Sequence, residues 1–141
     1  MPFEPMNAPF LSGTAAATLV DASGIAPPVI ISGDSTATVE WTISGLFVPL
    51  LDGNSHFLIT VFLERKGPGA DLEFPLAPVD VLLNSGTPIV GGLSYSVDIP
   101  IADADVTNGA YTVTAVITST DALGNPATMA GFVELGMRQW S

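Results

Sequence analysis

The strict alternation of polar and apolar residues over positions 36–44 constrains the fold more than any other feature of the chain. The even-numbered positions of this segment hold hydroxyl residues and one glutamate, and the odd-numbered positions, which we call the apolar phase, hold apolar residues. The apolar phase holds Ala37, Val39, Trp41 and Ile43. Because successive side chains of a strand point to opposite faces, this period of two predicts a strand with one buried and one solvent-facing side.

Comparable segments recur along the chain, separated by residues typical of turns. Thr, Val and Ile dominate the segments, Gly, Pro, Asn and Asp lie between them, and no long apolar pattern has helical spacing. The predicted strands cover residues 14–20, 29–32, 36–44, 56–66, 71–74, 79–83, 93–101, 111–118 and 129–137. About seven principal strands at this spacing predict an all-β fold, an antiparallel sandwich or barrel.

The inward phases of these strands supply the core of one domain over residues 13–141. Beyond residues 36–44 they hold Phe57, Ile59, Val61, Leu63, Leu93, Tyr95, Val97, Ile99, Ile101, Tyr111, Val113, Ala115, Ile117, Met129, Val133, Leu135 and Met137. At ~25 cal/mol per Å² of buried apolar surface, these side chains suffice for a core. Pro100 lies on the outward phase of its strand, which indicates an edge position. Residues 1–12 contain three prolines and little periodicity, so they predict an extended N-terminal arm.

The charge balance excludes several classes of protein and of partner. The chain has 141 residues, of which 48% are hydrophobic, and 14 acidic against 3 basic residues give a net charge of −11. This apolar content can offset the entropy lost on folding, which excludes intrinsic disorder. Three scattered cations cannot neutralise many phosphates, and the acidic charge repels anionic lipid, so we expect neither nucleic acid nor membrane as partner. The absence of cysteine excludes disulfides and cysteine-ligated zinc.

The first residues of the chain lack both the basic start and the apolar run of a secretory signal. No stretch reaches the ~18 unbroken apolar residues of a membrane-spanning helix. We therefore expect cytoplasmic synthesis without a signal peptide, and a place in a released or surface particle stays open.

Two neighbouring segments carry a resemblance to a known superfamily. Residues 105–115, Asp-Val-Thr-Asn-Gly-Ala-Tyr-Thr-Val-Thr-Ala, resemble the E–F corner and F strand of immunoglobulin-like domains. Residues 120–128 look like the F–G hairpin of bacterial immunoglobulin-like modules, and Trp41 on an early inward strand is also typical. The resemblance implies a disulfide-free immunoglobulin-like β-sandwich in which the hydroxyl of Tyr111 closes the corner. It implies no particular function, because the superfamily hosts adhesion, structural and accessory roles.

Acidic and amide residues gather in the predicted connections. In an immunoglobulin-like sandwich, one end would bring together Asp21, Asp34, Asp103, Asp105 and Asn108, and the other end Asp52, Asn54, Asp121 and Asn125. Clustered oxygen ligands suit Ca²⁺, which makes the first set candidate metal ligands. The same residues also form ordinary turns, and no spacing matches a known calcium motif. The only histidine, His56, begins a predicted strand, where a polar structural role is expected in preference to catalysis.

The outward phase of one predicted sheet is unusually apolar. If residues 56–66, 111–118 and 129–137 lie side by side as strands C, F and G, their outward face collects Leu58, Phe62, Val116, Ala130 and Phe132. Contiguous apolar surface marks an interface, unless the tail or the arm of the same chain covers it. Phe3 and Phe10 of the arm and Trp140 near the C-terminus are further candidate anchors.

These features predict a non-enzymatic structural or interaction module, either a homo-oligomer or a subunit of a larger protein particle. Two alternatives stay open at this point: a calcium-stabilised adhesion or ligand-binding domain, and a small carboxylate-dependent hydrolase. No cofactor other than Ca²⁺ is expected.

Overall fold

The computed structural model describes residues 12–21, 30–66 and 73–140, which form ten strands and three short 3-10 turns. The longer strands are β1 (Ser12–Asp21), β3 (Ser35–Ser44), β4 (His56–Lys66), β8 (Gly92–Ile101), β9 (Gly109–Thr120) and β10 (Pro126–Trp140). The shorter elements are β2 (Ile30–Ile31), η1 (Val48–Leu50), β5 (Glu73–Pro75), β6 (Val79–Leu82), η2 (Leu83–Ser85), β7 (Thr87–Ile89) and η3 (Asp103–Asp105). The predicted all-β class is confirmed, and none of the described residues forms an α-helix.

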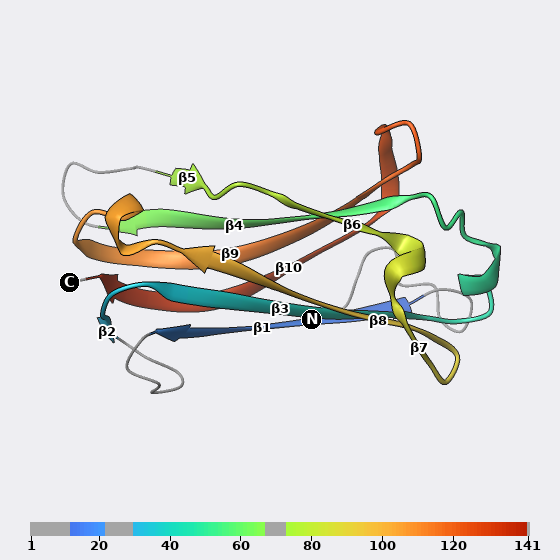
Figure 1. Cartoon of the computed structure of the whole chain (residues 1–141), viewed down its shortest axis with the longest axis horizontal. Coiled ribbons are helices and arrows are strands. Elements are labelled where there is room, and N and C mark those ends of the chain that lie inside the picture. Colours follow the sequence, from blue (N-terminus) through green and yellow to red (C-terminus); the bar gives the residue numbers. More distant parts are fainter. Residues whose placement is uncertain (1–11, 22–29, 67–72, 141) are drawn as a thin grey trace.

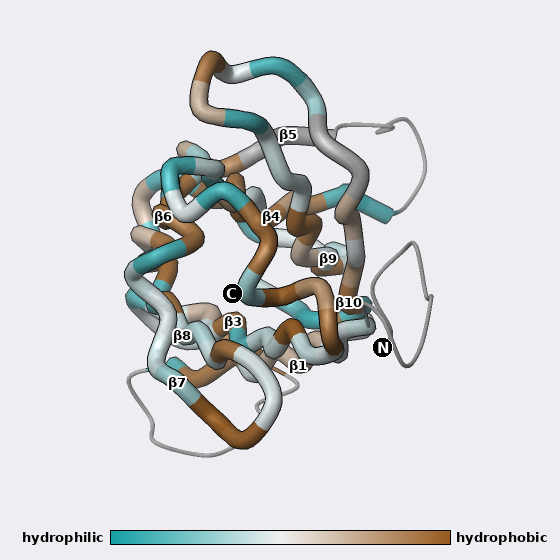
Figure 2. The backbone as a smooth tube through the Cα atoms, turned by 90° about the vertical axis from the view of Figure 1, so that its right-hand side faces the viewer, coloured by the Kyte–Doolittle hydropathy of each residue, from teal (hydrophilic) through white to brown (hydrophobic). Residues whose placement is uncertain are grey.

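The strands form two stacked sheets (Figure 1; seen end-on in Figure 2). One sheet has the order β1-β3-β8-β7, and the other has the order β2-β10-β9-β4-β5, with β6 also paired to β4. Every described pairing is antiparallel except the two-residue contact of β2 with β10. The antiparallel sandwich is therefore confirmed. Periodicity could not predict β7, because three residues centred on Pro88 are too few to alternate visibly.

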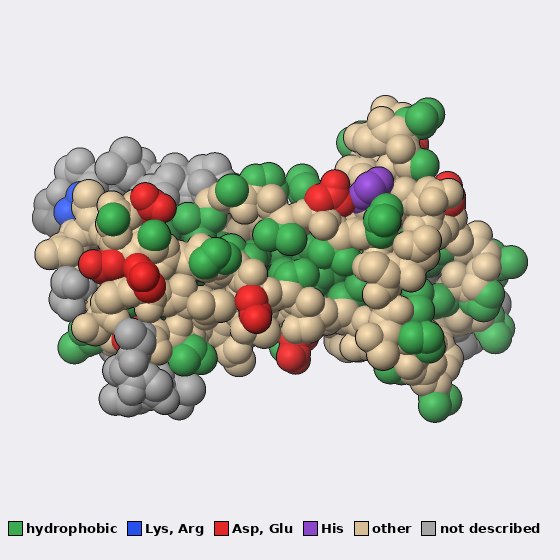
Figure 3. All heavy atoms as spheres, in the orientation of Figure 1, with side chains coloured by type: hydrophobic (Ala, Val, Ile, Leu, Met, Phe, Trp, Pro, Cys, Tyr) green, Lys and Arg blue, Asp and Glu red, His purple; other side chains and the backbone are tan. Residues whose placement is uncertain are grey.

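Strand β8 has a partner on both sides only at its beginning. β3 pairs with all of β8, whereas β7 pairs only with residues 92–94. Pro100 accordingly lies in the half of β8 that forms a sheet edge, as predicted. Val97 lies at this edge and is half-buried, although full burial was predicted. Leu93, in the part of β8 that pairs with β7, was also predicted to be buried and is half-buried. Figure 3 shows hydrophobic side chains along the flank between β6 and β8.

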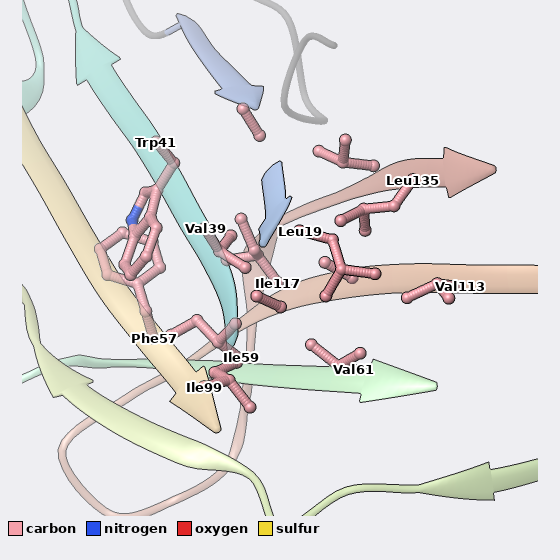
Figure 4. Packing of buried hydrophobic residues seen from close by; sticks show 14 of the residues in the cluster. Leu19, Val39, Trp41, Phe57, Ile59, Val61, Ile99, Val113, Ile117 and Leu135 are labelled. Atoms are coloured by element: carbon pink, nitrogen blue, oxygen red, sulfur yellow. The ribbon is translucent and has the colours of Figure 1, made fainter. Parts of the chain in front are cut away.

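The core fills the space between the sheets, and the predicted inward phases of β3, β4 and β9 are all buried (Figure 4). Trp41 stacks on Tyr95 with ring centroids 5.1 Å apart, and Phe57 meets both rings edge-on at 5.6 and 5.0 Å. Full burial of each large apolar side chain stabilises the fold by about 1.5–3 kcal/mol. These residues from three strands therefore join the two sheets.

A bulge in β10 explains why the predictions for Met137 and Trp140 are wrong. Glu134 pairs with Thr114, but Gly136 pairs with Val113, so β10 holds one extra residue at this point. The extra residue reverses the phase of the strand beyond it. Met137, predicted to point inward, is 57% exposed, and Trp140, predicted as a surface anchor, is fully buried. Trp140 packs edge-to-face against Tyr111 at 5.5 Å and belongs to the core.

The predicted arm over residues 1–12, with Phe3 and Phe10, lies outside the described residues except for Ser12, which begins β1. Among the described residues, no helix has the length and apolar character needed to cross a membrane.

Candidate functional site

The outward side of β4, β9 and β10 carries the predicted apolar residues in adjacent rows. The ladder aligns Leu58 with Thr118 and Ala130 in one row, and Thr60 with Val116 and Phe132 in the next. Phe62 follows in the third row, opposite Thr114. We call this surface, formed by Leu58, Phe62, Val116, Ala130 and Phe132, the β4–β9–β10 face.

The β4–β9–β10 face interleaves apolar side chains with Thr60, Thr114 and Thr118. Phe132 is 48% exposed, whereas Leu58, Phe62 and Val116 are half-buried by their neighbours. A shallow hollow of about 380 Å³ lies beside Phe62. Its remaining lining residues are Glu64, Thr112, Thr114 and Val116. Glu64 also pairs with Lys66 at 3.1 Å, so charged groups lie at one margin of the face.

The C-terminal strand does not cross the β4–β9–β10 face. Residues 136–140 continue alongside β9, and the last two pair with β2. The described residues of the C-terminal strand therefore leave this face uncovered, and the residues of the predicted arm before Ser12 lie outside the described part.

Two of the candidate calcium ligands, Asp21 and Asp34, accept hydrogen bonds from backbone N–H groups through their carboxylates. Asp21 is buried and accepts a 2.9 Å hydrogen bond from the Ser32 backbone N–H, while Asp34 accepts one of 2.9 Å from the Asp103 N–H. Asp105 is exposed in η3, and the Asn108 carbonyl accepts a 3.4 Å bond from Arg65. Within the described ranges, no three His, Asp or Glu side chains lie close enough together to hold a metal ion. The hydrogen bond between Asp34 and Asp103 nevertheless brings two of the candidates together, and the calcium site stays a prediction.

The second set of acidic and amide residues caps its own turns. Asp52 accepts a 3.0 Å bond from the Asn54 N–H. Asp121 accepts 2.9 Å bonds from the N–H groups of Leu123 and Asn125 in the turn between β9 and β10. The Asn125 backbone N–H contributes most to lowering the pKa of Asp121 below its ordinary value, because it stabilises the charged carboxylate.

His56 begins β4, as predicted for a polar residue at a strand start. Its Nδ1 lies 2.7 Å from the Asp80 carboxylate on β6, the strand beside it. The pair joins two neighbouring strands at the surface.

One end of the sandwich carries an apolar surface that the sequence patterns did not reveal (Figure 2). The β3–β4 connection and the β7–β8 turn meet here, joined by a 3.1 Å hydrogen bond from the Gly45 N–H to the Gly91 carbonyl. We call residues 45–51 and 89–93 the loop end. Its exposed large side chains are Leu46, Phe47, Leu50, Ile89 and Val90. The uninterrupted apolar run over residues 46–51 was a signal, but strand periodicity does not apply to loops.

A buried tyrosine next to the loop end forms a hydrogen bond with the neighbouring turn η2. The Tyr95 hydroxyl donates a hydrogen bond to the Leu83 carbonyl in η2, and burial raises the pKa of Tyr95 to about 12. The phenol therefore stays protonated and keeps donating at any physiological pH. This contact fixes η2, which leads directly into β7.

No protein-family model and no curated protein matches the sequence. Among solved structures, the chain is similar to a selenomethionine-labelled β-glucosidase from Kluyveromyces marxianus, with 10% identity and a TM-score of 0.35 over 90% of this chain. It is also similar to β-glucosidase 3B from Thermotoga neapolitana in complex with glucose, with 17% identity and a TM-score of 0.32 over 74% of this chain. The chain spans 14% of the length of each of these proteins. At such TM-scores the similarities support no conclusion about fold or function.

Proposed function

We propose that this protein is a non-enzymatic structural module that docks onto other protein subunits through the β4–β9–β10 face. The observation that carries the proposal is the 48% exposed Phe132 beside Val116, with Phe62 in the next row of the same sheet surface. Covering apolar surface gains about 25 cal/mol per Å², and a contiguous apolar patch on a folded domain usually marks an interface.

The topology supports an immunoglobulin-like assignment within this proposal. The order β1-β3-β8-β7 against β10-β9-β4 resembles the strands A-B-E-D against G-F-C of such domains. The Tyr111 hydroxyl donates a 2.8 Å hydrogen bond to the Thr107 carbonyl, as the resemblance implied for the corner before strand F. Immunoglobulin-like modules commonly serve adhesion and assembly, which agrees with an interaction role.

Substitution of Phe132 by Asp tests the proposal. A carboxylate at the centre of the docked face would be desolvated without a partner, so the Phe132→Asp variant should lose self-association or docking. Sedimentation velocity measures the mass of the full chain alone and in the presence of candidate partner proteins. Because Phe132 points away from the core, the far-ultraviolet circular dichroism of the variant should match that of the wild type.

Ser96→Asp on the outward side of the other sheet is the control, because it adds the same charge at an exposed position. An unfolded Phe132→Asp protein, or equal loss of association in both variants, would contradict the proposal.

A further inference from the structure

Part of strand β8 has an edge that no described strand occupies. β3 pairs with β8 along its whole length, whereas β7 pairs only with residues 92–94 on the other side. On the side of β7, residues 95–101 therefore have no partner among the strands that the structure describes. An unpaired edge presents a row of backbone N–H and C=O groups and is a template for one more strand. We call residues 95–101 the open edge.

The register shows which backbone groups point to the open edge. Pro88, in the middle of β7, has no N–H, so β7 bonds to β8 through the residues on either side of it, one of which faces Ser94. Because successive residues of a strand direct their N–H and C=O groups to opposite sides, Ser96 and Asp98 direct theirs to the same side as Ser94. Pro100 follows with a C=O only. The open edge therefore offers a donor and an acceptor at Ser96 and at Asp98.

Apolar side chains line the gap between the open edge and β6. Val97 on β8 and Val79 and Val81 on β6 are half-buried and pack against the core. Val79 and Val81 pair with the buried residues Ile59 and Phe57 of β4, so they also face inward. Figure 3 shows hydrophobic side chains along this flank of the molecule. A strand added to β8 would place every second side chain over them, because side chains alternate between the two sides of a strand.

The outward side of an added strand would meet a carboxylate. Asp98 is exposed there and accepts a 2.7 Å hydrogen bond from the Thr38 hydroxyl. Residues 67–137 contain neither lysine nor arginine. A basic residue opposite Asp98 would form a favourable cross-strand pair, whereas β8 of a second copy would bring only another carboxylate. The charge of the open edge therefore favours a basic strand from another protein over a second copy of this chain.

From these observations we infer that the open edge binds an extended segment of another protein by antiparallel strand addition. The backbone groups of Ser96 and Asp98 bond to this segment. The segment carries apolar side chains opposite Val97 and lysine or arginine opposite Asp98. This interaction uses a sheet edge, whereas the proposed function uses the β4–β9–β10 face. The inference therefore goes beyond the proposed function and does not depend on it.

Fluorescence polarisation of a labelled, end-capped peptide of alternating lysine and valine, titrated with the full chain, tests the inference. The peptide should bind saturably. A peptide of the same composition with all its valines in one block should bind at least about tenfold more weakly, because it cannot present an apolar and a basic side at once.

Methylation of the peptide backbone tests the strand pairing itself. Lysines that lie opposite Ser96 and Asp98 direct their backbone N–H groups to β8, and the valines between them direct theirs away. Methylation of the lysine backbone nitrogens should therefore weaken binding at least about tenfold, and methylation of the valine backbone nitrogens should leave it unchanged.

Substitutions on the protein test the charge of the open edge. Asp98→Lys should weaken binding of the alternating peptide about three- to tenfold, because it replaces attraction by repulsion, and Ser96→Asp should strengthen binding. Glu134→Lys makes the same charge change at an exposed position on the other sheet and should leave binding unchanged. Phe132→Asp should also leave it unchanged, which separates this inference from the proposed function. Circular dichroism should show the wild-type fold for each variant.

Several outcomes would overturn the inference. Equal binding of the alternating and block peptides, or of the two methylated peptides, would mean that general attraction to an acidic protein explains the binding. Absence of saturable binding to the wild-type chain would overturn it too. A chain that dimerises by itself and becomes monomeric in Asp98→Pro, which removes an N–H from the open edge, would overturn it in favour of a second copy.

Discussion

At the scale of single residues, polar side chains stabilise individual turns by forming hydrogen bonds with nearby backbone groups. Tyr111 is fully buried, and its hydroxyl lies 2.8 Å from the Thr107 carbonyl and 2.9 Å from the Thr107 Oγ1. Asp121 performs the same kind of task in the β9–β10 turn, where three donors surround its carboxylate. In both places a polar side chain replaces water at backbone groups that regular strand pairing leaves exposed.

Tyr111→Phe should destabilise the protein by about 1 kcal/mol, because the ring keeps its packing while the Thr107 carbonyl loses a buried partner. Urea unfolding followed by tryptophan fluorescence measures the change in the free energy of unfolding. The companion variant Thr107→Val removes only the Oγ1 and should cost less. Equal stability of Tyr111→Phe and the wild type would show that the corner bond contributes nothing.

The carboxylate of Asp121 makes stability depend on pH. Its folded-state pKa lies below the ordinary value of 3.8, so its charge stabilises the fold at pH values above 3.8. This contribution is lost as the pH falls through the folded-state pKa. The Asp121→Asn variant should therefore be less stable than the wild type at pH 7, with the difference shrinking below pH 3.8. Urea titrations at pH 7 and at acidic pH measure it, and a difference that grows on acidification would contradict the assignment.

At the scale of elements, the bulge in β10 matters most. It lets Leu135 and Trp140 both reach the core, although they lie on opposite phases of an ideal strand. Gly136 provides the conformation this requires, with φ at +83°. The bulge therefore decides which side chains of the last strand are buried and which, like Met137, face solvent.

Gly136→Ala should destabilise the fold by about 1–2 kcal/mol, because a side chain at this positive φ is strained. Gly131→Ala on the same strand is the control, since Gly131 is not among the described glycines with positive φ. Chemical denaturation of both variants provides the comparison. The prediction is contradicted if Gly131→Ala is the more damaging of the two.

At the scale of the whole molecule, the sandwich offers two separate apolar surfaces, one on a sheet and one at an end. The β4–β9–β10 face lies along the long side of the second sheet, and the loop end lies where β3 leads into β4. Phe132→Asp changes the first surface and leaves the second intact, because Phe132 lies on β10 and not in residues 45–51 or 89–93.

The sequence by itself determined the class of fold and most of the core, because alternation with a period of two depends only on the geometry of a strand. It thereby placed Trp41, Phe57 and Tyr111 in the core and Phe132 on an outward face. The predicted neighbours β4, β9 and β10 also lie side by side.

Only the tertiary structure determined the features that depart from alternation with a period of two. The one-residue bulge before Gly136 turned Trp140 inward and Met137 outward. The local sequence pattern does not predict this change of phase. The loop end exists because two connections distant in sequence meet through the Gly45–Gly91 hydrogen bond. Of the five candidate calcium ligands, Asp21 and Asp34 direct their carboxylates to the backbone N–H groups of Ser32 and Asp103. Such features depend on the register between strands and on contacts between distant parts of the chain. The spacing of residue types within one strand encodes neither of these.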